Sequence, residues 1–221
     1  MAEPLKAMYT LNFLRHFGDR VHAQHKDFNT DDFVSAVMAP PWDELELKAR
    51  MRRITDSLGT HLGLCYQEAF GVLFAIEEDC VGFPYLFFPD FVEVFGQAKE
   101  DWELSMKALE RFTKRSSSEF AVRVFLLREP VKMMAQMEIW SKDPNEHVRR
   151  LSSEGCRPRL PWGQALPMFK LDPVPVIPVL EQLKSDPSLY VRKSVANNLN
   201  DIAKDNPKLV IEIARRWKGI D

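Results

Sequence analysis

The sequence predicts an all-α fold, in which pairs of short helices stack into an α-solenoid. Three observations support this prediction. The 221 residues include only nine glycines and no Asn-Gly or Asp-Gly turn, so strand hairpins have no local signal. Apolar residues recur three and four positions apart along most of the chain. A segment rich in arginine, Asp143–Trp162, is partly repeated by Asp186–Asp201.

This repeat sets the expected size of one helix pair. Both segments open with Asp-Pro, and a Val-Arg pair begins four residues after the proline. Val148-Arg149 and Val191-Arg192 lie 43 residues apart, within the roughly 40–47-residue period of HEAT and armadillo helix pairs. Glu119–Arg123 is a third, looser copy. We therefore expect one HEAT-like or armadillo-like repeat domain over residues 1–221.

Helices of the first half are placed by apolar spacing and by capping residues. Asn29-Thr30-Asp31 is typical of a helix N-terminus. The phenylalanines from Phe70 to Phe95 occur on predicted helices and are expected to pack in the core. The segments predicted as helices are Met8–His22, Asp31–Met38, Leu45–Leu58, Leu62–Ile76, Phe88–Phe95 and Trp102–Thr113.

Prolines mark the helices of the second half. Prolines at 130, 144, 173, 187 and 207 each precede a predicted helix, where a missing N–H does no harm. The predicted helices are Ser118–Leu127, Val131–Trp140, Glu146–Cys156, Val174–Leu183, Leu189–Ala203 and Leu209–Trp217.

Composition excludes several classes of protein. No apolar run reaches about 18 residues, so no membrane-spanning helix is expected. No charged segment followed by an apolar one opens the chain, so no secretory signal is expected. Cys65, Cys80 and Cys156 fit free thiols in the cytoplasm. No zinc-binding motif is present, and neither a metal nor another cofactor is expected.

Charge is distributed unevenly along the chain. Residues 1–110 carry a net charge of −9 and residues 111–221 carry +7, although the whole chain carries only −2. A basic half indicates a surface for a polyanion. The alternative is that the two halves simply attract each other, with their charges solvated.

Helical periodicity predicts which polar residues share a face. His147, Arg150, Glu154 and Arg157 lie opposite the apolar residues of Glu146–Cys156. Lys193, Asn197 and Asp201 lie opposite those of Leu189–Ala203, and Glu119 and Arg123 share the polar side of Ser118–Leu127. If these helices are neighbours, one surface presents the acids Glu119, Glu154 and Asp201 among Arg123, Arg150, Arg157, Arg159 and Lys193, with Arg149 and Arg192 at its edges. Arginines suit phosphates, so the acids need another purpose.

Several motifs of the chain resemble the AlkC branch of the HEAT-like-repeat DNA glycosylases. The most specific is Ser153-Glu-Gly-Cys-Arg-Pro-Arg-Leu-Pro-Trp162. Further matches are Ser117-Ser-Glu119-Phe-Ala-Val-Arg123, Asn145-Glu-His-Val-Arg-Arg150, the Glu-Leu-Lys-Ala-Arg segment at 46–50, and Val191-Arg192 with Asn198-Leu-Asn-Asp201. The resemblance covers nearly the whole chain.

The resemblance implies base excision repair. Family members excise cationic N-alkylated bases such as 3-methyladenine from duplex DNA, acting on a lesion left largely in the duplex. Carried over residue by residue, Glu154, Asp201, Glu119 and Trp162 match the active-site positions. The resemblance also implies a C-shaped solenoid whose basic concave face grips the duplex. From the helix faces, we expect the residues that hold the duplex to be Arg123, Arg149, Arg150, Arg157, Arg159, Arg192 and Lys193. A monomer without metal or cofactor is implied. Two features of family members are missing from this sequence: the immunoglobulin-like domain of one subgroup, and a further C-terminal helix pair.

The chemistry is consistent with carboxylates. An alkylated purine already carries a positive charge and leaves readily, so no strong general acid is needed. A carboxylate beside the sugar stabilises an oxocarbenium-like transition state and can orient or deprotonate water. An aromatic face at Trp162 suits a cationic base.

Each residue also has a structural alternative. Glu119 follows Ser116 by three residues, as in a capping box. Glu154 can pair with Arg150 or Arg157 along its helix. Asp201 can be a surface residue near a helix end, and Trp162 can fill a loop against the core. Two other functions stay open, a non-catalytic binder of branched or distorted DNA and a HEAT-like protein scaffold.

Overall fold

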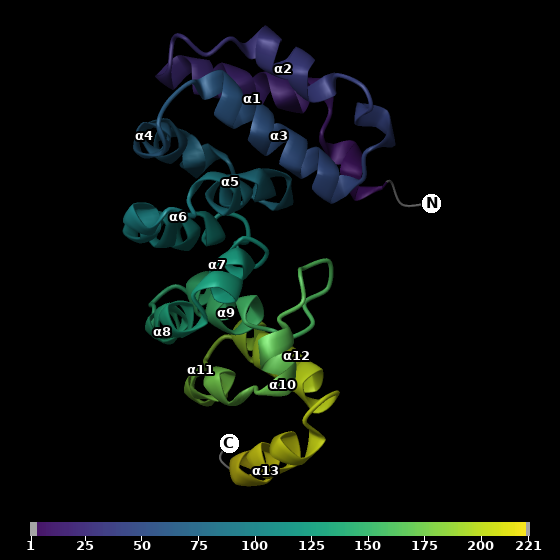
Figure 1. The fold of residues 1–221 in the computed structure, drawn as a ribbon, viewed down its shortest axis with the longest axis vertical. Coiled ribbons are helices and arrows are strands. Elements are labelled where there is room, and N and C mark those ends of the chain that lie inside the picture. Colours follow the sequence, from purple (N-terminus) through teal and green to yellow (C-terminus); the bar gives the residue numbers. More distant parts are fainter. Residues whose placement is uncertain (1–3, 220–221) are drawn as a thin grey trace. The chain divides into compact units, whose positions relative to one another are not determined.

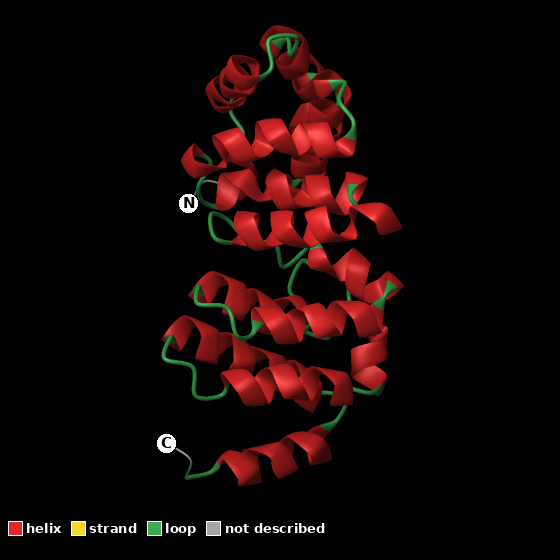
Figure 2. Ribbon diagram, turned by 90° about the vertical axis from the view of Figure 1, so that its left-hand side faces the viewer, coloured by secondary structure: helices red, strands yellow, loops and turns green. Residues whose placement is uncertain are grey.

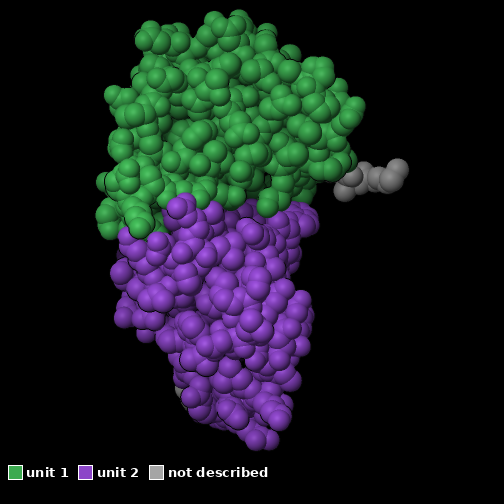
Figure 3. All heavy atoms as spheres, viewed as in Figure 1, with its two compact units in different colours: residues 1–117 green, residues 118–221 purple. Residues whose placement is uncertain are grey.

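The computed structural model describes residues 4–219, and all regular structure in this range is helical (Figure 2). The all-α prediction is therefore confirmed. The chain divides into two compact units, Met1–Ser117 and Ser118–Asp221 (Figure 3). The C-shaped solenoid and the single domain over 1–221 stay predictions. No helix within residues 4–219 combines the length and the apolar character needed to cross a membrane.

Unit 1 is built around stacked and tilted aromatic rings. Phe17 meets Phe87 with ring centroids 4.8 Å apart, and Phe88 meets Phe112 at 5.1 Å. Of the predicted phenylalanine core, Phe70, Phe87, Phe88 and Phe91 are buried, whereas Phe83 and Phe95 are more than a third exposed. The α-helices of the unit are α1 Leu11–Gln24, α2 Thr30–Met38, α3 Leu47–Leu62, α4 Tyr66–Ile76, α5 Phe87–Phe95 and α6 Trp102–Thr113 (Figure 1).

Local sequence signals explain where two helices of unit 1 begin and end. The Asn29 side chain accepts hydrogen bonds from the backbone N–H groups of Asp31 and Asp32, which caps α2 as predicted. Gly63 adopts a left-handed φ of 62° and ends α3, so the predicted helix 62–76 begins later, at Tyr66. In the Glu46–Arg50 motif, the Arg50 guanidinium is buried and donates to backbone carbonyls.

Unit 2 contains two helix pairs of similar design. α8 Pro130–Trp140 packs against α9 Glu146–Gly155, and α11 Ile177–Leu183 packs against α12 Leu189–Ala203. Corresponding helices also meet, α9 on α12 and α8 on α11 (Figure 1). This stacking of like on like is what a repeat protein requires. The remaining helices are α7 Val122–Arg128, α10 Pro167–Leu171 and α13 Pro207–Trp217.

The repeated Asp-Pro and Val-Arg residues form one recurring turn. Arg149 Nη1 donates to the carbonyls of Asp143 and Pro144, at 3.0 and 2.9 Å. Arg192 Nη1 does the same for Asp186 and Pro187, at 2.5 and 3.1 Å. In each turn the aspartate Oδ1 accepts the backbone N–H two residues on. The arginine of each pair thus fixes the turn before its own helix. We did not predict this role, because we assigned both arginines to DNA.

Two further elements of the structure differ from the prediction. Ser118–Leu127 was predicted as a helix, but α7 begins only at Val122. α10 was not predicted, since five residues show no period.

Candidate active site

The two carboxylates with the main predicted roles lie on neighbouring helices. Glu154 is in the last turn of α9 and Asp201 in the last turn of α12, and these two helices pack together. Both side chains are buried, with exposed fractions of 5% and 3%. A buried carboxylate needs charged or hydrogen-bonding partners, so its partners define the site.

Arg157 joins these two carboxylates. Its Nη1 donates to Glu154 Oε1 at 2.6 Å and its Nε donates to Asp201 Oδ2 at 2.8 Å. Arg150 extends the network. Its Nη2 lies 3.4 Å from Glu154 Oε1, and its Nη1 donates to Glu119 Oε2. Acids and arginines therefore alternate, from Glu119 through Arg150, Glu154 and Arg157 to Asp201, and all three predicted acids meet in one cluster.

The cluster has one more carboxylate than it has arginines. Burial lowers the pKa of Arg157, but the hydrogen bond to Asp201 and the charge of Glu154 outweigh burial and raise the pKa above its usual value. Lys204 meets Asp201 Oδ1 at 3.2 Å, but its side chain is 59% exposed. Water screens this exposed charge. The third buried cation is Arg123, whose charge acts on Asp201 and Glu119, so the buried carboxylates and arginines balance.

The predicted helix face of Asp201 was wrong. Periodicity grouped Asp201 with Lys193 and Asn197, which the structure leaves exposed on α12. Asp201 instead belongs to a buried polar row on α12, with Ser194 and Asn198. Arg157, too, lies inside, 9% exposed. A pattern argument assigns charged residues to solvent, whereas here they satisfy one another between two packed helices.

Glu119 does not form the alternative capping box. α7 starts three residues after Glu119, and its N-cap residue is Ala121. The buried hydroxyl of Ser116 has no hydrogen-bond partner. The position of Glu119 is therefore set by Arg150 and not by a helix terminus.

Arg123 was expected on the DNA-facing surface, and the structure instead buries it, 1% exposed. Its Nη1 donates to the Gly155 carbonyl and its Nη2 to the Arg157 carbonyl, both at 3.0 Å. Its Nε donates to the carbonyl of Gln164. Burial lowers the pKa of Arg123 to about 10. Because its donors point to the backbone, Arg123 positions the loop after α9.

That loop carries Trp162, which lies at the surface. Trp162 is 63% exposed and has a left-handed φ of 60°, a conformation that is uncommon for a bulky residue. The next residue, Gly163, packs closely against Leu160. A Cβ added to Gly163 would come within 2.9 Å of Leu160 Cδ2. Trp162 therefore does not fill the core, and the loop presents its side chain outward.

The other predicted DNA-binding residues differ in their surroundings. Arg149 and Arg192 hold the Asp-Pro turns, as described above. Arg159 donates to both oxygens of Asp205, at 2.7 and 3.0 Å from Nη2, and remains 38% exposed. Lys193 is exposed on α12.

Sequence reasoning missed two neighbours of the cluster. Ser194 Oγ donates to Glu154 Oε2 at 2.6 Å. Tyr190, 45% exposed, lies with its ring 5.1 Å from Arg150 Cζ. Only the packing of α12 on α9 brings them here, so no local signal in the sequence marks them.

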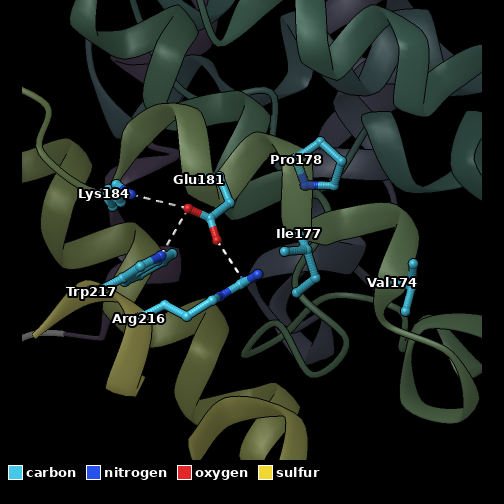
Figure 4. Close-up of a pocket in the computed structure, with 7 residues that line it drawn as sticks. All are labelled: Val174, Ile177, Pro178, Glu181, Lys184, Arg216 and Trp217. Carbon is cyan, nitrogen blue, oxygen red and sulfur yellow. Dashed lines mark hydrogen bonds and ion pairs between the residues drawn. The ribbon is translucent and has the colours of Figure 1, made fainter. Parts of the chain in front are cut away.

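Metal-binding groups and pockets are the other places where a functional site can lie. Among residues 4–219, no group of three or more His, Cys, Asp or Glu side chains is placed to hold a metal ion. A pocket of about 540 Å³ lies between α11 and α13 (Figure 4). Its Glu181 carboxylate accepts from Trp217 Nε1 and Arg216 Nη2, both at 2.8 Å. None of the predicted site residues lines this pocket.

Nearly the whole length of this chain is similar to part of a DNA glycosylase. The structure matches the "Pseudomonas fluorescens alkylpurine DNA glycosylase AlkC bound to DNA containing an abasic site analog" with a TM-score of 0.93 and 40% identity, covering 99% of this chain and 60% of that one. The resemblance to AlkC-type DNA alkylation repair glycosylases is therefore confirmed.

A curated relative comes from another organism. The "Uncharacterized protein YhaZ" of Bacillus subtilis (strain 168) is 50% identical over 215 residues, which are 97% of this chain and 60% of that protein. The chain thus spans about 60% of the length of both relatives. No protein-family model matches the chain.

Proposed function

We propose that this chain is a DNA glycosylase that hydrolyses the N-glycosidic bond of cationic N-alkylated bases in duplex DNA. The observation that carries the proposal is the buried cluster in which Arg150 and Arg157 hold Glu119, Glu154 and Asp201 together. The likeness to the DNA-bound AlkC supports the same function.

The fixed carboxylates of the cluster fit this reaction. A base alkylated at a ring nitrogen carries a positive charge and departs with the electrons of the glycosidic bond. The sugar then gains oxocarbenium character, which fixed carboxylates stabilise in a water-poor site. Water adds to C1′ and loses a proton to a nearby carboxylate. The products are the free base and an abasic sugar.

Glu154 and Asp201 are the residues we assign to this chemistry. Each is buried and already held by Arg157, so neither needs to reorganise as charge develops. Each ionised carboxylate has further lone pairs for a substrate or a water. Glu119 supports them through Arg150. Trp162 offers an exposed aromatic face to the deoxyribose and the cationic base.

Phosphate contacts are proposed for the exposed basic residues, above all Arg159 and Lys193. Arg150 and Arg157 are mostly occupied by carboxylates, and we give them an orienting role.

The decisive experiment measures release of 3-methyladenine from methylated duplex DNA. We expect release by the unmodified chain and a loss of at least about 100-fold in Glu154→Gln and Asp201→Asn. Glu212→Gln is the matched control, because Glu212 is exposed on α13, away from the cluster. Circular dichroism checks that each variant is folded.

Failure of this experiment has two readable forms. Salt-sensitive DNA binding without base release would overturn the glycosylase and favour the binder of branched or distorted DNA. No DNA affinity at physiological salt would favour the protein scaffold.

A further inference from the structure

Two buried serines, Ser194 and Ser153, lie near Glu154 Oε2, the carboxylate oxygen opposite the one that the arginines contact. Ser194 is 2% exposed and Ser153 is fully buried. The Ser194 hydroxyl lies 2.6 Å from Glu154 Oε2 and 3.1 Å from the Ser153 hydroxyl. Glu154 is thus contacted on both oxygens, by arginines on Oε1 and by a hydroxyl on Oε2.

The proton positions follow from what each group can donate. An ionised carboxylate only accepts, and a serine hydroxyl has one proton. Ser194 therefore donates to Glu154, and the proton between the two serines comes from Ser153. Hydrogen bonds in such a chain polarise and strengthen one another in a buried setting.

The surrounding residues keep this hydroxyl chain in place. Asn198 Nδ2 donates to the backbone carbonyl of Ser153 at 2.7 Å, which ties α12 to the end of α9. Ser194 is flanked along the buried side of α12 by Val191 and Val195. The Ser194 hydroxyl is thus held between apolar neighbours on α12 and the Glu154 carboxylate on α9.

We propose that Ser194 is a positioning residue for catalysis, which fixes the Glu154 carboxylate through a buried hydrogen bond to Oε2. This inference rests on the proposed glycosylase function. Without the bond, Glu154 keeps its arginines on one oxygen only, and its second oxygen is free to rotate away from the sugar. Loss of the bond is therefore expected to slow the chemical step and to leave DNA affinity unchanged.

The charged groups around Glu154 do not change in a Ser194 variant. Arg150 and Arg157 contact Glu154 directly, and Glu119 and Asp201 act through them. Loss of the Ser194 donor therefore removes one hydrogen bond and no charge. A slower chemical step with unchanged DNA affinity is the readout that a merely structural role would not produce.

The test compares single-turnover base release by Ser194→Ala, Ser194→Thr and the unmodified chain. We expect Ser194→Ala to be about 10- to 100-fold slower, with unchanged DNA affinity. Threonine keeps the hydroxyl and should restore the rate to within about threefold. Ser152→Ala is the control, because Ser152 is equally buried on α9 but donates to the Arg149 carbonyl.

The outcomes separate this inference from the function on which it rests. No release by the unmodified chain refutes the glycosylase itself. Release by the unmodified chain, with Ser194→Ala matching Ser152→Ala in rate, refutes the positioning role alone. If Ser194→Ala does not fold, Ser194→Cys keeps the volume with only a weak donor, and a wild-type rate in that variant refutes the role equally.

Discussion

Arg149 and Asp186 are joined by two hydrogen bonds, Nε to Oδ2 at 2.6 Å and Nη2 to Oδ1 at 3.0 Å, across 37 positions of sequence. The same guanidinium holds its own Asp-Pro turn, and Asp186 begins the next one. This single contact therefore connects the two repeated segments of unit 2. It is mostly buried, with side-chain exposures of 14% and 4%.

We expect Arg149→Lys to lower the free energy of unfolding by about 2 kcal/mol, because one ammonium cannot replace a forked guanidinium serving four acceptors. Urea denaturation gives the value. Arg215→Lys, at an exposed position of α13, should leave stability unchanged. Equal stability of both variants would mean that the contact contributes nothing.

Acid should weaken the same contact. Burial raises the pKa of Asp186, but the hydrogen bond from Arg149 and that from the Ser188 backbone outweigh it, so the pKa is lowered. A lowered pKa stabilises the fold above the unfolded value, about pH 4, and this contribution is lost as pH falls through the folded value. Melting temperatures between pH 2 and 7 should show a smaller acid-induced drop for Asp186→Asn. An identical drop would contradict the assignment.

The three thiols should differ in reactivity. Burial raises the pKa of Cys156 to about 12 and that of Cys80 to about 11, so both are protonated at neutral pH. Cys65 is exposed. Ellman's reagent at pH 8 should modify one thiol per native chain quickly, and none in Cys65→Ala. Two or more fast thiols would show that the buried sites open readily.

Asp205 should compete with DNA for Arg159. The bidentate pair occupies an arginine that we assign to phosphate. We expect Asp205→Asn to bind DNA about two- to fivefold more tightly at low salt. Arg159→Ala should reduce the slope of log affinity against log salt by about one. Unchanged binding in both variants would remove Arg159 from the DNA-contacting set.

Arg123 should act on the fold and not on phosphate. Arg123→Lys leaves backbone carbonyls of the loop without donors, so we expect unfolding to become easier by about 2–4 kcal/mol. Proteolysis within 157–166 should become faster. The salt dependence of DNA binding by the folded protein should not change. A stable variant with a reduced salt slope would restore the phosphate assignment made from the sequence.

The sequence predicted the helices of this protein better than their buried polar faces. Trp102–Thr113 and Leu189–Ala203 were predicted with the observed bounds, because apolar spacing is a local signal. α10 was missed because a single turn has no period. The grouping of Glu119, Glu154 and Asp201 was predicted from helix faces and from motif resemblance, and the structure brings them into one cluster.

The inward orientation of Asp201, Arg123 and Arg157 could not be predicted from their own helices. A charged residue is assigned to solvent unless its partner is known. The backbone groups that hold Arg123, and the two members of the Arg157–Asp201 pair, are separated by 32 to 44 residues of sequence. Ser194 shows the same limit, since a serine on a helix face has no marked preference until the facing residue is Glu154.

The polar contact between α9 and α12 also has a geometrical consequence. Two apolar helices can slide past one another by part of a turn and still bury similar area. Here a slide would separate Arg157 from Asp201 and Ser194 from Glu154, leaving buried charges without partners. The contact therefore selects one register between the helices. The spacing of Glu154 and Asp201 is consequently a built-in dimension of the repeat, set when the two helices dock and before any ligand arrives.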